Sequence, residues 1–237
     1  EKAGSAAADG AAGEGTENGA DGIMKWQTVT RSESDAVISA LIDERADAYR
    51  EGLFAYGSEE EYRQERMKES LKEAAWALVL QWRSGSIDEM YFEESFGRAA
   101  DKVFPAVSVP TSRGDVFIEG KIDRVDILKN GAVKVIDYKS GQEKFSAEEA
   151  RGGWRLQLML YLKAASGSKN GEKKHEPAGI FYFLIKDTDI KSDGMSGEEI
   201  AEKISDSVKK EFRMNGLIVD SGDNAESIAG EFERYSD

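Results

Sequence analysis

The residues best suited to chemistry lie in two short stretches, residues 120–126 (GKIDRVD) and 135–141 (VIDYKSG). Alternate side chains of a strand share one face, so Asp137 and Lys139 continue a face that two valines begin. An acid and a base on an otherwise apolar face are costly unless their charges are compensated. A divalent cation held by two carboxylates would compensate them, and a lysine beside it can position or deprotonate water. The alternative is a structural ion pair of Asp137 with Lys139 or Arg124.

The two stretches flank Asn130-Gly131, a strong hairpin signal, and are therefore expected to pair as antiparallel strands. A two-residue loop would place Asp123 opposite Tyr138. A three-residue loop with Gly131 in the left-handed conformation would place Asp123 opposite Asp137 instead. Because two carboxylates can share a metal only from one face, we predict the second register or an equivalent bulge.

The elements that must position these residues follow from hydrophobic period, capping boxes and turn residues. The first helix is expected to open at Ser32 and to carry an apolar stripe of Ala36, Val37, Ala40 and Leu41. In chain order, the predicted elements are helices over about 32–49 and 58–84, strands over 90–96, 116–128 and 132–139, a helix over 147–165, a strand over 180–185 and a helix over about 197–212. This order predicts an α/β or α+β domain with a mixed central sheet flanked by helices.

Residues 1–31 are predicted to be a flexible linker or surface insertion, because residues 1–22 hold seven Ala, six Gly and no large apolar side chain. The rest is assigned to one domain with a helical part (32–88), a core (89–225) and a tail (226–237).

Composition excludes several classes of protein. The chain has 237 residues and no cysteine, which excludes disulfides, a cysteine nucleophile, thiolate zinc and an iron–sulfur cluster within it. No apolar run approaches the roughly 18 residues that span a membrane. No phosphate-binding G-x-x-x-x-G-K-[ST] loop occurs, so no ATP-driven step is expected in this chain. The lone histidine, His175, is isolated in a predicted loop, so no Ser–His–Asp triad is expected.

The net charge of −14 argues against a nucleic-acid partner, but the charge is unevenly distributed. Residues 98–175 carry 15 Lys or Arg and 10 Asp or Glu, a net of +5 inside an acidic chain. A positive middle fits a local surface for a polyanion, and ordinary scatter of surface charge explains it equally well.

The ordered set of GKIDRVD, IDYKSG and a helix bearing Gln157-x-x-x-Tyr161 resembles the PD-(D/E)XK nucleases of the RecB type. The resemblance implies a restriction-endonuclease-like core in which Asp123 and Asp137 ligate Mg²⁺, helped by the backbone carbonyl of Tyr138. It implies that Lys139 orients the attacking water and stabilises charge on the phosphate. Gln157 and Tyr161, which share one helix face, would hold the DNA backbone or support the metal ligands.

A narrower resemblance, to the C-terminal nuclease region of AddB proteins, covers about residues 32–225. It is carried by residues 94–97 (ESFG), 177–183 (PAGIFYF) and 212–219 (FRMNGLIV). It implies Mg²⁺-dependent hydrolysis of one DNA strand, with Mn²⁺ able to substitute, in double-strand-break repair. The implied partners are DNA and an AddA-like helicase–nuclease subunit, and the implied compartment is the cytoplasm.

Further positions follow from the same resemblance. Glu94 matches a family acid that serves either the metal or the fold, and a first metal-site motif is expected upstream of Glu1. The residues expected to contact DNA are Arg124, Ser140, Lys144 and Arg155. The alternative function is a catalytically silent domain of the same fold that binds DNA or docks a subunit.

Overall fold

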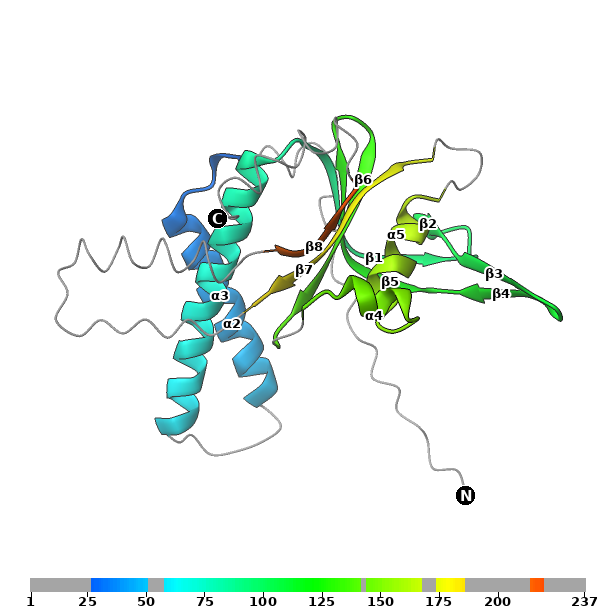
Figure 1. Ribbon diagram of the computed structural model, residues 1–237. Coiled ribbons are helices and arrows are strands. Elements are labelled where there is room, and N and C mark those ends of the chain that lie inside the picture. The colour runs from blue at the N-terminus through cyan, green and yellow to red at the C-terminus, as the bar shows by residue number, and fades with distance from the viewer. Residues whose placement is uncertain (1–26, 51–57, 142–143, 168–173, 186–213, 220–237) are drawn as a thin grey trace, which may run out of the picture.

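A computed structural model (Figure 1) describes residues 27–50, 58–141, 144–167, 174–185 and 214–219. The expected linker over 1–31 lies almost entirely outside these residues, as do the expected helix over 197–212 and the expected tail over 226–237. No helix in the described part of the chain is long and apolar enough to cross a membrane.

A six-stranded mixed sheet forms the centre of the fold, in the order β2-β1-β5-β6-β7-β8. Its strands are β1 (Ile87–Gly97), β2 (Phe104–Pro105), β5 (Gly120–Leu128), β6 (Ala132–Lys139), β7 (Glu176–Leu184) and β8 (Met214–Ile218). The pairs β1–β2 and β6–β7 are parallel and the other three are antiparallel. The predicted mixed α/β architecture is therefore confirmed.

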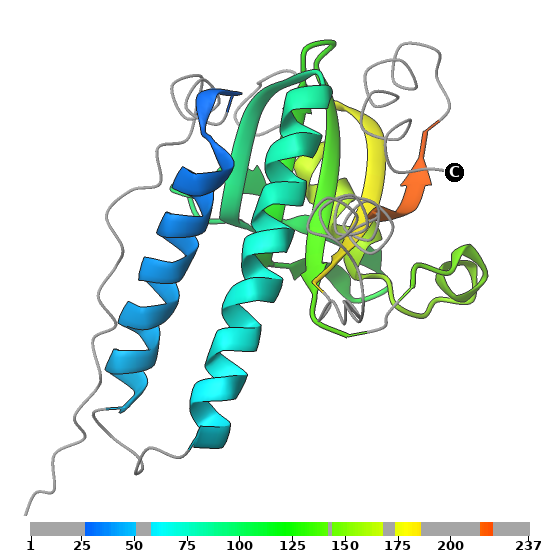
Figure 2. The ribbon, with the colours of Figure 1, turned by 90° about the vertical axis from the view of Figure 1, so that its left-hand side faces the viewer.

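Helices cover both faces of the sheet (Figure 1). The long helix α3 (Ser58–Ser84) lies on one face, with α2 (Arg31–Arg50) packed against it. Figure 2 views the domain from this side, with α2 and α3 in front of the sheet. The other face carries α4 (Ala147–Arg151) and α5 (Gln157–Ala165). Because both faces are covered, the central strands β6 and β7 are apolar runs that are buried along most of their length.

The register of the β5–β6 hairpin is the one that a shared metal site requires. The paired residues run from Ile127 with Val133 to Arg124 with Ile136. Gly131 has φ of 81° and donates its N–H to the carbonyl of Leu128 at 2.7 Å, which closes the predicted three-residue loop. Continued by one residue, this register brings Asp123 opposite Asp137.

Two predicted elements are broken in the structure. The expected strand over 116–128 divides at Glu119 into β4 (Gly114–Ile118) and β5, and β4 leaves the main sheet to pair with β3 (Val107–Thr111). The expected helix over 147–165 divides at Gly152-Gly153 into α4 and α5, because Gly153 adopts φ of 83°. Its start is as predicted, since the Ser146 side chain accepts a hydrogen bond from the Glu149 N–H at 3.2 Å.

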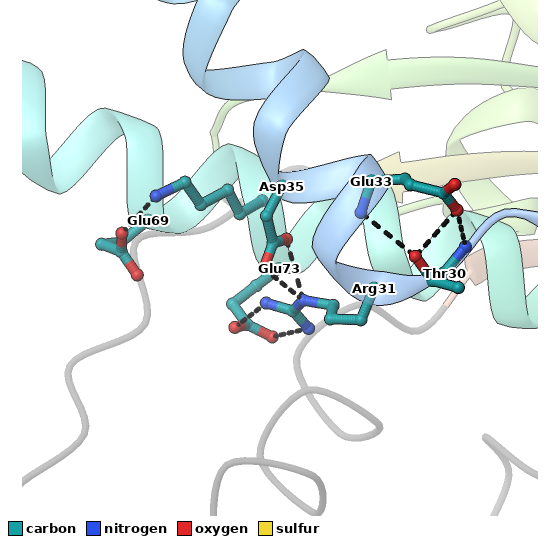
Figure 3. A network of polar contacts seen from close by, with 7 residues as sticks. Thr30, Arg31, Glu33, Asp35, Glu69 and Glu73 are labelled. Atoms are coloured by element: carbon teal, nitrogen blue, oxygen red, sulfur yellow. Dashed lines mark hydrogen bonds and ion pairs between the residues drawn. The ribbon is translucent and has the colours of Figure 1, made fainter.

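Helix α2 begins earlier than the predicted Ser32, with a capping box of Thr30 and Glu33 (Figure 3). The Thr30 N–H donates to the Glu33 carboxylate at 2.7 Å, and the Glu33 N–H donates to the Thr30 hydroxyl at 3.3 Å. Arg31 then joins α2 to α3, with hydrogen bonds to Asp35 at 2.8 Å and to Glu73 at 3.2 Å.

The apolar stripe of α2 lies on the side of the helix away from α3. All four of its members are exposed, and Val37 and Leu41 keep 56% and 49% of their surface. The helix is buried instead through the neighbouring face, at Ser34 and Ile42.

Candidate active site

The two acids of the predicted site lie on the middle strands β5 and β6, one residue beyond the last paired residues, Arg124 and Ile136. The side chain of Asp137 is 2% exposed and Asp123 is half-buried. The Asp123 carboxylate accepts a hydrogen bond from the backbone N–H of Tyr138 at 3.0 Å, which ties the two strands together beside Asp137. Since the N–H and C=O of a strand residue point to the same side, the Tyr138 carbonyl faces β5 as well.

A continuous line of polar contacts joins β6 to α5. The Lys139 ammonium lies 2.6 Å from the Asp137 carboxylate and donates to the Gln157 side-chain carbonyl at 3.1 Å. The Gln157 amide donates in turn to the Tyr161 hydroxyl at 2.8 Å. Tyr161 is fixed by an edge-on contact with Phe96, with 6.0 Å between the ring centroids. The residues that the two motifs single out are thus assembled in space, although far apart in sequence.

The electrostatics of this line favour a charged lysine. Burial lowers the pKa of Lys139, but its hydrogen bond to Asp137 and the charge of that carboxylate outweigh burial and raise the pKa above its usual value. Burial also raises the pKa of the Tyr161 phenol, and the nearby charges of Asp137 and Asp123 add to that increase. Both side chains are therefore protonated near neutral pH, and each can act as a hydrogen-bond donor.

The donor set fits a hard divalent cation. Mg²⁺ is typically held by one or two carboxylates, with water and phosphate oxygens completing its shell. Asp123 and Asp137 supply two such carboxylates, and Lys139 provides one positive charge beside the buried Asp137. Within the described residues, no cluster of three or more His, Cys, Asp or Glu side chains occurs, so this part of the chain would contribute the two acids and a backbone oxygen.

Arg124 does not belong to a DNA-facing surface, contrary to expectation. It is 0% exposed and lies on the opposite face of the sheet, beneath α3, where both its Nε and its Nη2 bond Asp126 at 2.7 Å. Lys134 lies 3.3 Å from the same carboxylate, and Trp82 stacks under the Arg124 guanidinium at 5.0 Å. The three charged side chains form a structural cluster, defined here as the buried triad (Arg124, Asp126 and Lys134).

The other expected DNA contacts are accessible. Ser140, Lys144 and Arg155 are all exposed, and Arg155 forms an ion pair with Glu149 at 3.2 Å. Glu94 pairs with Ile122 in the β1–β5 ladder, and its carboxylate accepts a hydrogen bond from the Ser95 N–H at 3.2 Å. That contact is local and does not connect Glu94 to the two acids.

One site residue was not expected from the sequence. Tyr182 of β7 is paired with Asp137 in the parallel ladder, and its ring lies 5.5 Å from the Lys139 nitrogen. The ring is 3% exposed and forms one wall beside the lysine. Its position depends on the pairing of β6 with β7, across the whole α4–α5 crossover, and no local sequence signal reveals that pairing.

Comparison of the sequence with those of known proteins shows the family to which the chain belongs. The sequence model of the PD-(D/E)XK nuclease superfamily matches residues 19–235 of the chain. The chain belongs to this superfamily. It is also 33% identical over 205 residues, 83% of its length, to the B subunit of the ATP-dependent helicase/deoxyribonuclease of Alkaliphilus metalliredigens.

Other relatives of the same name agree. The corresponding protein of Alkaliphilus oremlandii is 33% identical over 202 residues, and that of a Thermoanaerobacter species is 30% identical over 200 residues. The predicted resemblance to AddB proteins is thereby confirmed. The chain covers only 17% of the length of each of these relatives, although the matches cover 82–83% of the chain.

Proposed function

We propose that this domain is a metal-dependent deoxyribonuclease that hydrolyses phosphodiester bonds of one DNA strand. The observation that carries the proposal is the line Asp137–Lys139–Gln157–Tyr161, with Asp123 in register beside it. Superfamily membership and the deoxyribonuclease named in its relatives support the same reaction.

Asp123, Asp137 and the Tyr138 carbonyl would hold Mg²⁺, for which Mn²⁺ can substitute. The cation supplies a Lewis acid that polarises the phosphate and lowers the pKa of a bound water molecule. Lys139 has three N–H donors, of which one points to Asp137 and one to Gln157, so the third remains for a phosphate oxygen or the attacking water. A positioned, protonated lysine stabilises the charge that develops on the phosphate.

Gln157 and Tyr161 set the direction of that lysine. Gln157 accepts from Lys139 and is itself oriented by its bond to Tyr161, so the pair fixes the ammonium without adding a charge. Held in this way, the lysine is oriented before DNA binds, which is the pre-organisation that catalysis requires.

The biological setting that we propose follows from the relatives. The domain would act as the nuclease of an AddB-type protein, together with an AddA-like helicase–nuclease subunit, in cytoplasmic double-strand-break repair. The exposed Ser140, Lys144 and Arg155 would contact the DNA backbone on the way to the site.

A cleavage assay on single-stranded DNA tests the reaction. With Mn²⁺ we expect slow cutting by the 237-residue chain, because no motor delivers the strand to the site. Lys139→Ala should reduce the rate by about 10²–10³-fold, the usual effect of losing one charge-stabilising donor. Lys129→Ala, at the exposed turn of the β5–β6 hairpin and at the other end of β6 from Lys139, is the matched control and should cut at the wild-type rate.

Equal rates for wild type and Lys139→Ala would contradict the catalytic assignment. A chain that binds DNA and cuts none, in Mg²⁺ or in Mn²⁺, would favour the alternative of a silent DNA-binding or subunit-docking domain.

A further inference from the structure

Trp154 is the most exposed large apolar side chain of the described residues, with 73% of its surface accessible. It lies in the linker between α4 and α5. Leu156 and Met159, 40% and 36% exposed, follow it at the N-cap and in the first turn of α5. Solvent exposure of a tryptophan is unfavourable, so its indole is a candidate binding surface.

The linker holds the backbone of Trp154 in a defined place. The backbone N–H of Trp154 donates to the Glu149 carbonyl at 2.9 Å, and the backbone N–H of Gly152 donates to the Glu148 carbonyl at 3.0 Å. Arg155 has φ of 52°, a conformation that a non-glycine residue rarely adopts. In Figure 2 the yellow-green α4 segment stands out from the body of the domain. The side chain is therefore presented on a fixed backbone.

The backbone of Trp154 also lies close to the candidate active site. Trp154 precedes Gln157 by three residues, and a chain extends at most about 3.6 Å per residue, so their Cα atoms lie within about 11 Å. Gln157 contacts Lys139 directly, at 3.1 Å. A nucleic-acid strand that reaches Lys139 with one phosphate can therefore reach Trp154 with a base only a few nucleotides away.

The surrounding charge indicates what kind of molecule binds there. Residues 144–163 carry four basic side chains, Lys144, Arg151, Arg155 and Lys163, against two acids, in a chain whose net charge is −14. A flat aromatic surface with basic neighbours is the combination that binds single-stranded nucleic acid: the cations follow the phosphates and bases stack on the ring.

We propose that Trp154 is a substrate-binding residue on which an unpaired base of the DNA strand stacks next to the active site. The proposal rests on the nuclease function proposed above and adds a basis for selectivity. Bases within a duplex are already stacked and paired, so the indole favours unpaired DNA over duplex. Every base has a π-face, so the preference is independent of sequence.

The size of the effect follows from the stacking of one base. Stacking on an aromatic side chain is worth about 1–3 kcal/mol per base, which corresponds to about a 5- to 150-fold change in dissociation constant. Trp154→Ala should lose this factor for unpaired DNA, whereas Trp154→Phe, which keeps a ring, should lose only part of it.

Anisotropy titrations of the 237-residue chain test the proposal, with EDTA present so that no DNA is cut. The probes are labelled oligo(dT), the same oligomer without bases, and a duplex of equal length. Phe117→Ala, which removes a 43% exposed ring from β4, is the matched control. We expect Trp154→Ala to weaken oligo(dT) binding about 5- to 150-fold and to leave duplex and base-free binding within about 2-fold. Phe117→Ala should bind all three probes as the wild type does.

Unchanged oligo(dT) binding by Trp154→Ala would overturn the proposal, as would an equal loss for oligo(dT) and the base-free oligomer. Either result would leave the exposed indole as a contact for a protein segment. Cleavage measured in Mn²⁺ on the same preparations separates the two hypotheses: a wild type that cuts DNA while Trp154→Ala binds normally overturns only the role of Trp154. A wild type that neither binds nor cuts DNA overturns both.

Discussion

Removing the carboxylate of the buried triad should destabilise the domain more than any surface substitution. Asp126 bonds Arg124 through both carboxylate oxygens at 2.7 Å and lies 3.3 Å from Lys134, and all three side chains are 0% exposed. Asp126→Asn keeps the shape of the side chain but leaves two buried cations without the anion that bridges them. The triad then changes from one net positive charge to two.

The magnitude can be bounded from the structure. Breaking a buried ion pair by removing one partner costs about 3–5 kcal/mol. Two cations lose their partner here, which favours the upper half of that range. The Trp82 and Phe92 rings, 5.0 and 5.9 Å from the guanidinium, offset part of the loss. For a domain of this size, a loss of about 3–5 kcal/mol lowers the melting temperature by roughly 6–20 °C.

Urea unfolding followed by circular dichroism measures this loss, with Asp115→Asn on the exposed β4 strand as the matched control. The triple variant Arg124→Met, Asp126→Leu, Lys134→Met should be far less destabilised than Asp126→Asn, because it leaves no unpaired buried charge. An Asp126→Asn domain within about 1 kcal/mol of wild type would refute the reasoning, since the triad could not then be desolvated as the structure shows.

Three other predictions follow from particular contacts. Gly131→Ala should lose about 1–2 kcal/mol in urea unfolding, because φ is 81° and the added Cβ meets no atom within 4 Å, which leaves backbone strain as the only cost; an unchanged midpoint would contradict the hairpin loop. The Thr30 N–H lowers the pKa of the Glu33 carboxyl, so that the stabilisation is present above the ordinary value of 4.5 and is lost as pH falls through the lowered pKa. Glu33→Gln should therefore reduce the melting temperature at neutral pH and have little effect well below pH 4.5, and equal effects at both would exclude the capping box as the cause. DNA binding should weaken with salt by a log–log slope of about −0.7 to −0.9 per phosphate contacted, and Lys144→Ala should reduce that slope by about one contact for all sequences alike; binding indifferent to salt would exclude DNA as the partner.

Local signals in the sequence are sufficient to predict the β5–β6 hairpin. Gly131 supplies the left-handed residue that a three-residue loop requires, and strand alternation then sets which side chains share a face. The local rules leave a two-residue and a three-residue loop open, and the requirement that both acids share a metal is what selects the register that places them opposite each other. The helix bearing Gln157 and Tyr161 is predictable for a similar reason, because four-residue spacing is a local property of a helix.

Strand alternation also explains why Arg124 is not in the site. It neighbours Asp123 in sequence, and adjacent residues of a strand point to opposite faces, so a residue next to a metal ligand is directed away from the metal. The same rule therefore predicts that Arg124 points to the face opposite Asp123, and the structure shows that α3 covers this face. That Lys134 lies against the same Asp126 carboxylate as Arg124 depends on the pairing of β5 with β6.

Other features could not be inferred because they depend on tertiary packing. The apolar stripe of α2 indicates an amphipathic helix, but the face that packs on α3 is chosen by Arg31 and its partners Asp35 and Glu73. The departure of β4 from the main sheet likewise depends on its pairing with β3. By contrast, Gly152-Gly153 is a local break signal that could have divided the predicted helix.

The central claim is that Asp123 and Asp137 together bind a divalent cation, and calorimetric titration of the 237-residue chain with Mn²⁺ tests it most directly. We expect saturable binding of Mn²⁺. Asp123→Asn and Asp137→Asn should each raise its dissociation constant by about 10–100-fold, while Asp115→Asn on β4 should leave it unchanged. Unfolding curves of the same variants show whether any loss of affinity is a loss of fold. Wild-type affinity for Mn²⁺ in a folded Asp137→Asn variant would contradict the shared metal site.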